Sequence, residues 1–264
     1  MERNQRFTTV KIATAITFSI MVIVNALANI LPINGITTGQ ISDSYPNLFA
    51  PAGWAFAIWG LIYLLLAGYT LYQLGVFQGT ATSVKTGLLS KIGIIFSISS
   101  IANAAWIFAW HYQIIPLSLI LIVVILVCLI LINQRINREQ LSATEKLFIG
   151  LPFSVYFGWI TVATIANATI LLVSWNWQGF GLAEPIWTVI IIVLGFLIGA
   201  LTMLKNRDIA YGLVIVWAYA AILSKHISPE GFAGQYPVII NTTIICIGLL
   251  LLAEGYLLIS QKRM

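Results

Sequence analysis

Charged side chains are scarce in this chain of 264 residues: they make up 8% of it, whereas hydrophobic residues make up 60%. A water-soluble domain of this length needs more charge on its surface than the sequence provides. Apolar runs of about 20 residues, the length of a helix that crosses a bilayer, recur along the chain instead. The composition therefore excludes a soluble globular protein and predicts an all-α, polytopic membrane helix bundle.

Cysteine is nearly absent, and both residues, Cys128 and Cys246, fall inside apolar runs. We therefore interpret them as small buried hydrophobic residues and expect neither a disulfide nor a metal site. The sequence also has no nucleotide-binding loop, no metalloprotease motif and no Ser/His/Asp spacing. No catalytic residue and no metal ligand are predicted, and the net charge of +5 is explained by membrane topology without nucleic acid.

Eight apolar runs are long enough to be spanning helices. The first five, within residues 1–173, are interpreted as a ligand-binding core, and the last three, within 174–264, as a C-terminal membrane extension. The seventh run is the shortest. The predicted spans are 10–31, 54–74, 92–111, 115–132, 147–172, 186–204, 209–224 and 237–259.

The basic residues predict the orientation of these helices. With eight spans, twelve of the 13 lysines and arginines fall on one side, from Arg3 to Arg263, and Lys225 falls on the other. The positive-inside rule makes the basic side cytoplasmic. We therefore expect a multi-pass protein of the inner or plasma membrane with both termini in the cytoplasm. In an alternative interpretation the basic start, the apolar run and Ala26-Leu-Ala28 form a cleaved secretory signal.

Four asparagines lie at a similar depth in the outer half of three spans: Asn25, Asn29, Asn103 and Asn167. An amide in hydrocarbon needs a hydrogen-bond partner, so these side chains are expected to face one another, the backbone, water or a ligand. Two interpretations stay open. The amides either hold helices together or line a shared cavity.

Aromatic residues gather at the start of the second span, in the run from Pro51 to Tyr63. Trp59 and Tyr63 are four residues apart, so their rings are expected to stack on one helix face. Seven tryptophans fall in or beyond the outer half of the membrane, whereas a simple interfacial belt would occupy both sides. This asymmetry indicates an outward-facing aromatic cavity or lid. The seven are Trp54, Trp59, Trp106, Trp110, Trp175, Trp177 and Trp187.

Ionisable residues within the spans are few. Glu254 is the one carboxylate well inside a span, which raises a proton or cation relay as a hypothesis beside a purely structural role. His111 and His226 lie at predicted outer loops or helix ends beside polar residues. We expect both imidazoles to be solvated rather than to bind an iron porphyrin.

Three spans in order resemble the tryptophan-rich sensory protein family, also called translocator protein or peripheral benzodiazepine receptor. The second span carries Pro51, Trp54, Phe56, Trp59 and Tyr63, similar to the family's Pro-Pro-x-Trp-x-Phe entry and Trp-x-x-x-Tyr. The third carries Asn103-Ala-Ala-Trp106, and the fifth carries Tyr156-x-x-Trp159 followed by Thr161, Ala163, Thr164 and Asn167. The resemblance covers residues 10 to about 173. It implies a five-helix fold whose cavity binds porphyrins, sterol-like lipids or hydrophobic drugs.

The chain departs from that family's pattern at several positions. Ala52 replaces the second proline, and the interval from Trp54 to Trp59 is one residue short. One residue rotates a helix face by about 100°, so one of the two tryptophans is expected to point away from the cavity, with Trp59 favoured inside. Val155 replaces a proline before Tyr156. The last three spans have no counterpart in the five-helix fold.

These observations predict binding of a hydrophobic planar ligand, a tetrapyrrole (porphyrin or haem) or a sterol-like lipid, with a sensory or transport role. Membrane lipid is the expected surrounding partner, and a homodimer is left open. Three alternatives stay open: a proton-coupled secondary transporter that uses Glu254, a membrane enzyme that degrades the macrocycle, and a scaffold. The predicted ligand-binding residues are Trp54, Trp59, Tyr63, Asn103, Trp106, Tyr156, Trp159 and Asn167.

Overall fold

The computed structural model describes residues 2–31, 33–78 and 85–262. Within them the chain is helical, without strands, and eight helices are long and apolar enough to cross a membrane. This confirms the predicted fold class and the count of eight spans. Arg263 lies outside the described residues, as do the side chains of Arg3, Arg6 and Lys262. The orientation of the termini stays a prediction.

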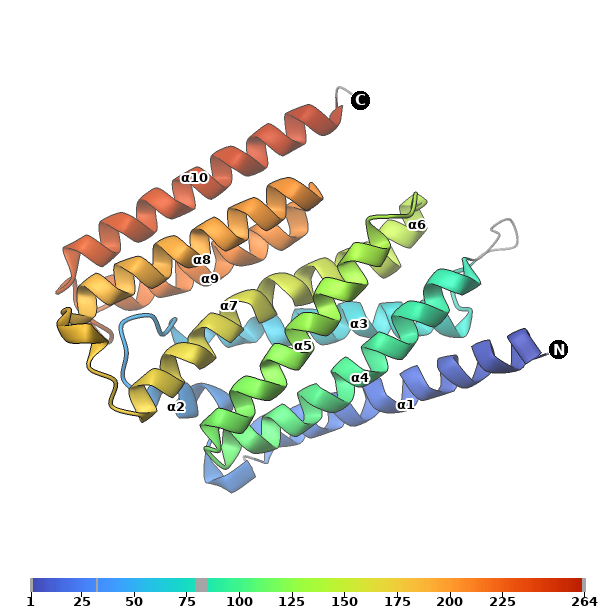
Figure 1. The fold of residues 1–264 in the computed structure, drawn as a ribbon, viewed down its shortest axis with the longest axis horizontal. Helices are drawn as coiled ribbons and strands as arrows, with labels where there is room; N and C mark the ends of the chain where they lie inside the picture. Colours follow the sequence, from blue (N-terminus) through green and yellow to red (C-terminus); the bar gives the residue numbers. More distant parts are fainter. Residues whose placement is uncertain (1, 32, 79–84, 263–264) are drawn as a thin grey trace. The chain divides into compact units, whose positions relative to one another are not determined.

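The long helices follow one another along the chain (Figure 1), and the connection from α1 to α3 contains three short helical elements. Their bounds are α1 (Glu2–Ile30), α3 (Ile58–Leu74), α4 (Thr86–His111), α5 (Ile115–Ile136), α7 (Leu151–Ser174), α8 (Glu184–Asn206), α9 (Ile209–Ile227) and α10 (Pro237–Lys262). The shorter elements are η1 (Ile33–Gly35), α2 (Thr38–Asp43), η2 (Gly53–Ala57), α6 (Ala143–Glu145), η3 (Lys146–Gly150) and η4 (Gly179–Gly181).

The chain forms two compact units. Unit 1 comprises residues 1–38 and 59–157, and unit 2 comprises 39–58 and 158–264. Both η2 and the later part of α7 therefore belong to unit 2. The predicted ligand-binding core at 1–173 divides the chain differently and stays a prediction.

In unit 1, α4 packs against α1 on one side and α5 on the other (Figure 1). Gly93 on α4 lets α1 and α3 approach α4 closely. A Cβ atom there would lie 2.7 Å from Val10 Cγ1 and 2.9 Å from Thr14 Oγ1, both on α1, and would overlap the amide of Gln73 on α3. Three further rings pack α3, α4 and α7 together, with centroids 4.7–5.5 Å apart: Tyr69, Phe96 and Phe153.

In unit 2, α8, α9 and α10 lie side by side (Figure 1), and η2 packs against α9. Gly158 on α7 brings that helix against α9, because a Cβ there would lie 2.9 Å from the carbonyl oxygen of Tyr211 and 2.9 Å from Val214 Cβ. The Tyr211 hydroxyl donates to Thr161 Oγ1 at 3.2 Å. This hydrogen bond joins the same two helices inside the unit.

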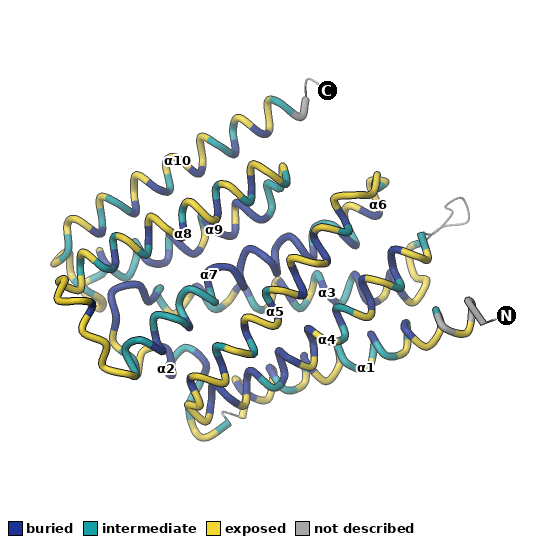
Figure 2. Tube along the Cα trace, viewed as in Figure 1, coloured by how far each residue is buried: buried dark blue, intermediate teal, exposed yellow. Residues whose placement is uncertain are grey.

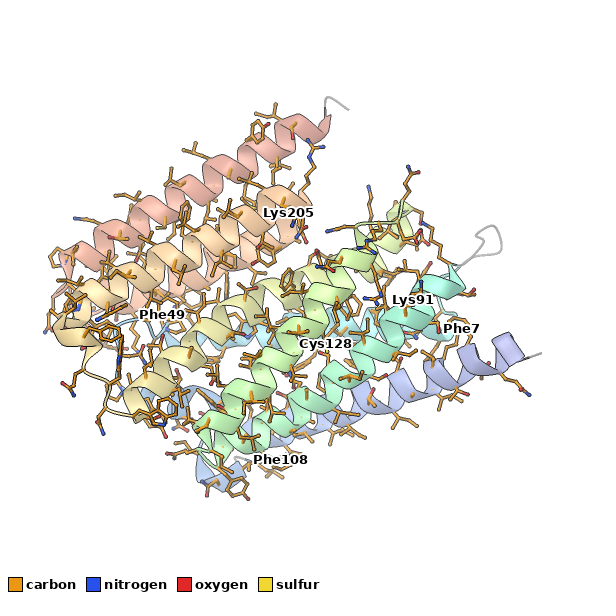
Figure 3. The ribbon with its side chains drawn as sticks, viewed as in Figure 1. Phe7, Phe49, Lys91, Phe108, Cys128 and Lys205 are labelled. Carbon is orange, nitrogen blue, oxygen red and sulfur yellow. The ribbon has the colours of Figure 1, made fainter. Side chains whose placement is uncertain are left out.

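Buried and exposed positions alternate along the long helices, as α5 and α10 show in Figure 2. The exposed positions include large apolar side chains, such as Leu64 on α3 and Leu252 on α10. A helix whose exposed face is apolar fits lipid as its solvent. Cys128 on α5 (Figure 3) and Cys246 on α10 are both free and buried, which confirms their interpretation as buried hydrophobic residues.

Candidate functional site: an aromatic cluster in unit 1

Four aromatic rings from three helices meet in unit 1. Trp59 and Tyr63 of α3 stack, with centroids 5.5 Å apart and planes 18° from parallel. The Trp59 ring also lies 6.3 Å from Trp106 on α4 and 6.1 Å from Tyr156 on α7. The stacking predicted from the four-residue spacing is therefore confirmed. Such pairs stabilise a cluster by about 0.5–1.5 kcal/mol each beyond area burial.

Trp59 and Tyr63 give this cluster an open edge. Their side chains are only half-buried, whereas those of Trp106 and Tyr156 are buried. The Tyr63 hydroxyl oxygen and the Trp106 indole nitrogen are themselves buried, yet neither has a hydrogen-bond partner among the described residues. Because a buried polar group without a partner costs free energy, these two atoms are available to a ligand.

A chain of amides supports the cluster from α1. Asn25 donates from Nδ2 to Asn103 Oδ1 at 2.7 Å, and Asn103 donates from its own Nδ2 to the Tyr156 hydroxyl at 3.0 Å. Asn103 is fully buried. Its side chain thus joins α1, α4 and α7 and fixes the position of one ring of the cluster. Asn29 is exposed and donates to the Asn25 carbonyl of its own helix, so it does not join the chain of amides.

The structure brings together five of the eight predicted site residues: Trp59, Tyr63, Asn103, Trp106 and Tyr156. The other three belong to unit 2. Trp54 of η2 packs edge-on against Trp217 of α9, with centroids 4.7 Å apart, and its indole donates to Ser224 Oγ. Trp159 of α7 meets Phe56 edge-on at 6.0 Å. Asn167 is buried further along α7.

The prediction of solvated histidines is wrong, because both imidazoles are fully buried. In unit 1, His111 makes contacts through both ring nitrogens, with the Ile33 carbonyl at 3.0 Å and Thr38 Oγ1 at 3.1 Å. In unit 2, His226 Nε2 lies 2.8 Å from the Leu48 carbonyl. Each ring anchors a connecting segment to a helix end. The sequence showed only the neighbouring polar residues, whereas the actual partners are 73–178 positions away.

The sequence interpretation missed Trp110 as an extension of the cluster. Its ring stacks on Trp106 at 5.4 Å, and its indole donates to the Thr38 carbonyl at 3.1 Å. The signal was present, because Trp106 and Trp110 have the same four-residue spacing as Trp59 and Tyr63. Helix periodicity thus explains two stacked pairs, Trp59 with Tyr63 and Trp106 with Trp110.

Within the described ranges no group of three or more His, Cys, Asp or Glu residues could hold a metal ion. The aromatic cluster itself contains no ionisable group of ordinary pKa near neutrality. Rings, two unpartnered polar atoms and a fixed amide can hold an apolar, flat molecule and orient its polar edge.

In a comparison with protein families, a model described as TSPO-like protein aligns with residues 11–256. The match extends through α8 and α9 into α10, well past residue 173, where the motif resemblance ends. Neither the curated proteins nor the solved structures gave a match.

Proposed function

Because the chain belongs to the TSPO-like protein family, we propose that it binds a hydrophobic planar ligand, a tetrapyrrole or a sterol-like lipid, in the aromatic cluster of unit 1. The observation that carries this proposal is the half-buried Trp59–Tyr63 stack beside buried, unpartnered polar atoms of Tyr63 and Trp106. A flat apolar molecule can stack on the rings and satisfy those atoms. A sensory or transport role would follow from such binding.

The Asn103 amide would act as an orienting group through Tyr156, whose hydroxyl it holds at 3.0 Å. The rings contact one another without a ligand, so binding is expected to separate the Trp59 and Trp106 rings rather than fill a rigid slot. That rearrangement costs about the stacking energy of one ring pair. Trp54, Trp159 and Asn167 stay predicted ligand contacts, and a variant at Trp159 tests them.

Titration of the detergent-solubilised, full-length protein with protoporphyrin IX tests the proposal. Replacing Trp59 with leucine is expected to weaken binding by up to about tenfold, since an aromatic pair contributes roughly 0.5–1.5 kcal/mol. Trp106→Phe keeps a ring but removes the indole N–H, so we expect a smaller loss of about threefold for one hydrogen bond. The shift of the porphyrin absorption band reports the affinity.

Trp175→Leu is the matched control, because Trp175 is 64% exposed and lies outside unit 1. Its affinity should equal that of the wild type. If Trp59→Leu and Trp106→Phe also bind with wild-type affinity, the aromatic cluster is not the site. A loss in Trp159→Phe alone would move the site to unit 2.

A second candidate function, proton-coupled transport, is favoured by Glu254 on α10. Its side chain is buried, and neither carboxylate oxygen has a hydrogen-bond partner among the described residues. The Glu254 carboxylate lies against Gly212 of α9 and near Met203 of α8. A Cβ atom on Gly212 would overlap the side chains of both Glu254 and Met203. Intramembrane carboxyl groups often mark functional sites, and proton relays are one such function.

Proteoliposomes that contain a pH-sensitive dye test this second function, with coproporphyrin III as the added solute. If Glu254 carries the proton, Glu254→Gln should abolish porphyrin-dependent proton uptake, because an amide cannot be ionised in this range. Glu139→Gln is the control, since that carboxylate is exposed and paired with Lys85 at 3.2 Å. Equal proton uptake in the wild type and Glu254→Gln would exclude the coupling role.

A further inference from the structure

Unit 2 contains a cavity of about 420 Å³, separate from the aromatic cluster of unit 1. It is lined by the end of α7, the start of α8 and the segment 46–49 of the connection before η2. Phe49, labelled in Figure 3, belongs to this segment. The volume of the cavity falls within the range of about 300–1,000 Å³ found for small-molecule sites.

Apolar and aromatic side chains make up much of the cavity lining. Leu172 and Val173 of α7 and Ile191 of α8 are among them, as are Trp177, which is 37% exposed, and Trp187. We call these two tryptophans the aromatic rim. The two indole rings lie 4.9 Å apart. The Trp187 N–H already donates to the Gly179 carbonyl, so the ring offers its apolar faces to the cavity rather than a hydrogen-bond donor.

Glu184 is the one charged residue among those that line the cavity. Its Oε1 accepts the Leu48 backbone N–H at 3.2 Å, which fixes the carboxylate, and its other oxygen has no partner among the described residues. The neighbouring Asn47 amide is occupied, because it donates to the Tyr45 carbonyl and accepts from the Phe49 N–H. Glu184 therefore supplies the anionic acceptor among the residues that line this cavity.

The loop that carries Trp177 is held in an unusual backbone conformation. Asn176 and Phe180 both have φ of 52°, a region that non-glycine residues rarely occupy, and Gly179 and Gly181 are also left-handed. A Cβ on Gly179 would lie 2.6 Å from the Trp187 ring. Backbone strain of this kind clusters at binding sites, where surrounding contacts maintain it. Here it places Trp177 and Phe180 against Trp187.

A carboxylate at the first position of α8 also stabilises that helix through its dipole. That role explains the position of Glu184 but requires neither the cavity nor the aromatic rim. It also disfavours an anionic ligand, since the positive helix end already faces a carboxylate. We propose that this cavity is a second ligand site, which binds a hydrophobic monovalent organic cation with its ammonium group at Glu184 and its apolar part against Leu172, Val173 and Ile191.

An ammonium group of this kind could belong to a water-borne solute or to a lipid headgroup, and the rim suits both. A carboxylate provides the charge, and indole faces attract cations at about 0.5–1 kcal/mol when exposed. The site would act independently of planar-ligand binding in unit 1. Its occupant is recognised by charge and apolar volume, whereas the cluster of unit 1 offers ring faces and two uncharged polar atoms.

Equilibrium dialysis of radiolabelled benzyltrimethylammonium tests the proposal, with the full-length protein in nanodiscs of phosphatidylglycerol. The wild type should bind, and excess neopentylbenzene, the neutral carbon isostere, should not displace the cation. Glu184→Gln should weaken binding about tenfold, as expected for one charged contact. Trp177→Leu should weaken it about two- to fivefold.

Glu230→Gln is the matched control, because Glu230 is an exposed carboxylate of the same unit outside the cavity lining. It should bind as the wild type does. Weaker binding in phosphatidylcholine nanodiscs would identify lipid ammonium headgroups as the natural occupant, and equal binding would identify a solute. Absence of binding, wild-type affinity in Glu184→Gln, or displacement by neopentylbenzene overturns the proposal.

Discussion

Gly158→Ala is expected to lower the free energy of unfolding by about 1–3 kcal/mol, the usual cost of forcing a methyl group into a packed contact. The added carbon would lie 2.9 Å from the Tyr211 carbonyl oxygen and 2.9 Å from Val214 Cβ. A backbone oxygen cannot rotate away as the end of a long side chain can. The α9 helix would therefore have to move from α7, which would also lengthen the hydrogen bond between Tyr211 and Thr161.

Cys246 provides the measurement for this variant, because it is a free, buried thiol of unit 2. In a Cys128→Ala background, its labelling by a fluorogenic maleimide on heating reports unfolding of the unit. A loss of 1 kcal/mol corresponds to roughly 2–4 °C for a chain of this size. Gly248→Ala is the control: that glycine of α10 has open space around its Cβ position. Alanine should stabilise the helix there by about 0.5–1 kcal/mol, so equal melting of the two variants would contradict the packing argument.

In unit 1, Gly93→Ala is expected to have an effect of similar size, about 1–3 kcal/mol. Three side chains from two helices surround the Cβ position, and the atoms of Val10 and Thr14 lie 2.7 and 2.9 Å away on short, stiff branches. The third, Gln73, donates from Nε2 to Thr14 Oγ1 at 3.3 Å. The methyl group would therefore disturb both the α1–α4 contact and this buried hydrogen bond.

Labelling of Cys128 in a Cys246→Ala background measures this effect in unit 1, since Cys128 lies buried on α5 (Figure 3). Gly87→Ala on the same helix is the matched control, because its Cβ position has no neighbour within 4 Å. The control should unfold at or slightly above the wild-type temperature. A Gly93→Ala protein that is as stable as the control would show that α1 and α4 do not approach as closely as the structure indicates.

The sequence predicted the features that depend on local chain properties. Eight spans follow from apolar runs because the backbone inside a bilayer must satisfy its hydrogen bonds within a helix. The stack of Trp59 on Tyr63 follows from helix periodicity, and so would that of Trp106 on Trp110. The burial of Cys128 and Cys246 follows from the apolar runs that contain them. The family membership was also predicted from motifs, and the match to residues 11–256 confirms it.

The separation of Trp54 from Trp59 shows where periodicity stops being sufficient. On a continuous α-helix, five residues rotate a side chain by about 140°. In the structure Trp54 lies instead in η2, a 3-10 helix that ends at Ala57, and Trp59 lies in α3. The change of helix type alters the angle between the two side chains. Trp54 therefore contacts Trp217 in unit 2, and Trp59 contacts Tyr63 in unit 1. From the shortened spacing alone, we could predict only that the two tryptophans would not share one face.

The sequence did not single out specific partners that are distant along the chain, although facing asparagines were one of the options it left open. Asn25 meets Asn103 across 78 positions, His226 meets the Leu48 carbonyl across 178, and Glu184 accepts from Leu48 across 136. A polar residue in an apolar run indicates that its side chain needs a hydrogen-bond partner, because an unpaired polar group in hydrocarbon raises the free energy of the fold. It does not identify that partner. Both histidines were for this reason expected in water, although the fold supplies acceptors that bury them.

By itself, then, the amino-acid sequence determined a membrane bundle of eight helices, its family and the pairing of aromatic residues four positions apart, because hydropathy and helix periodicity act over one or two helical turns. Only the tertiary structure decided which aromatic residues share a cluster, that Asn103 supports Tyr156, and that Glu184 stands at a cavity in unit 2. Those outcomes depend on how helices far apart in the chain pack, and packing is set by glycines such as Gly93 and Gly158 whose neighbours no local pattern reveals.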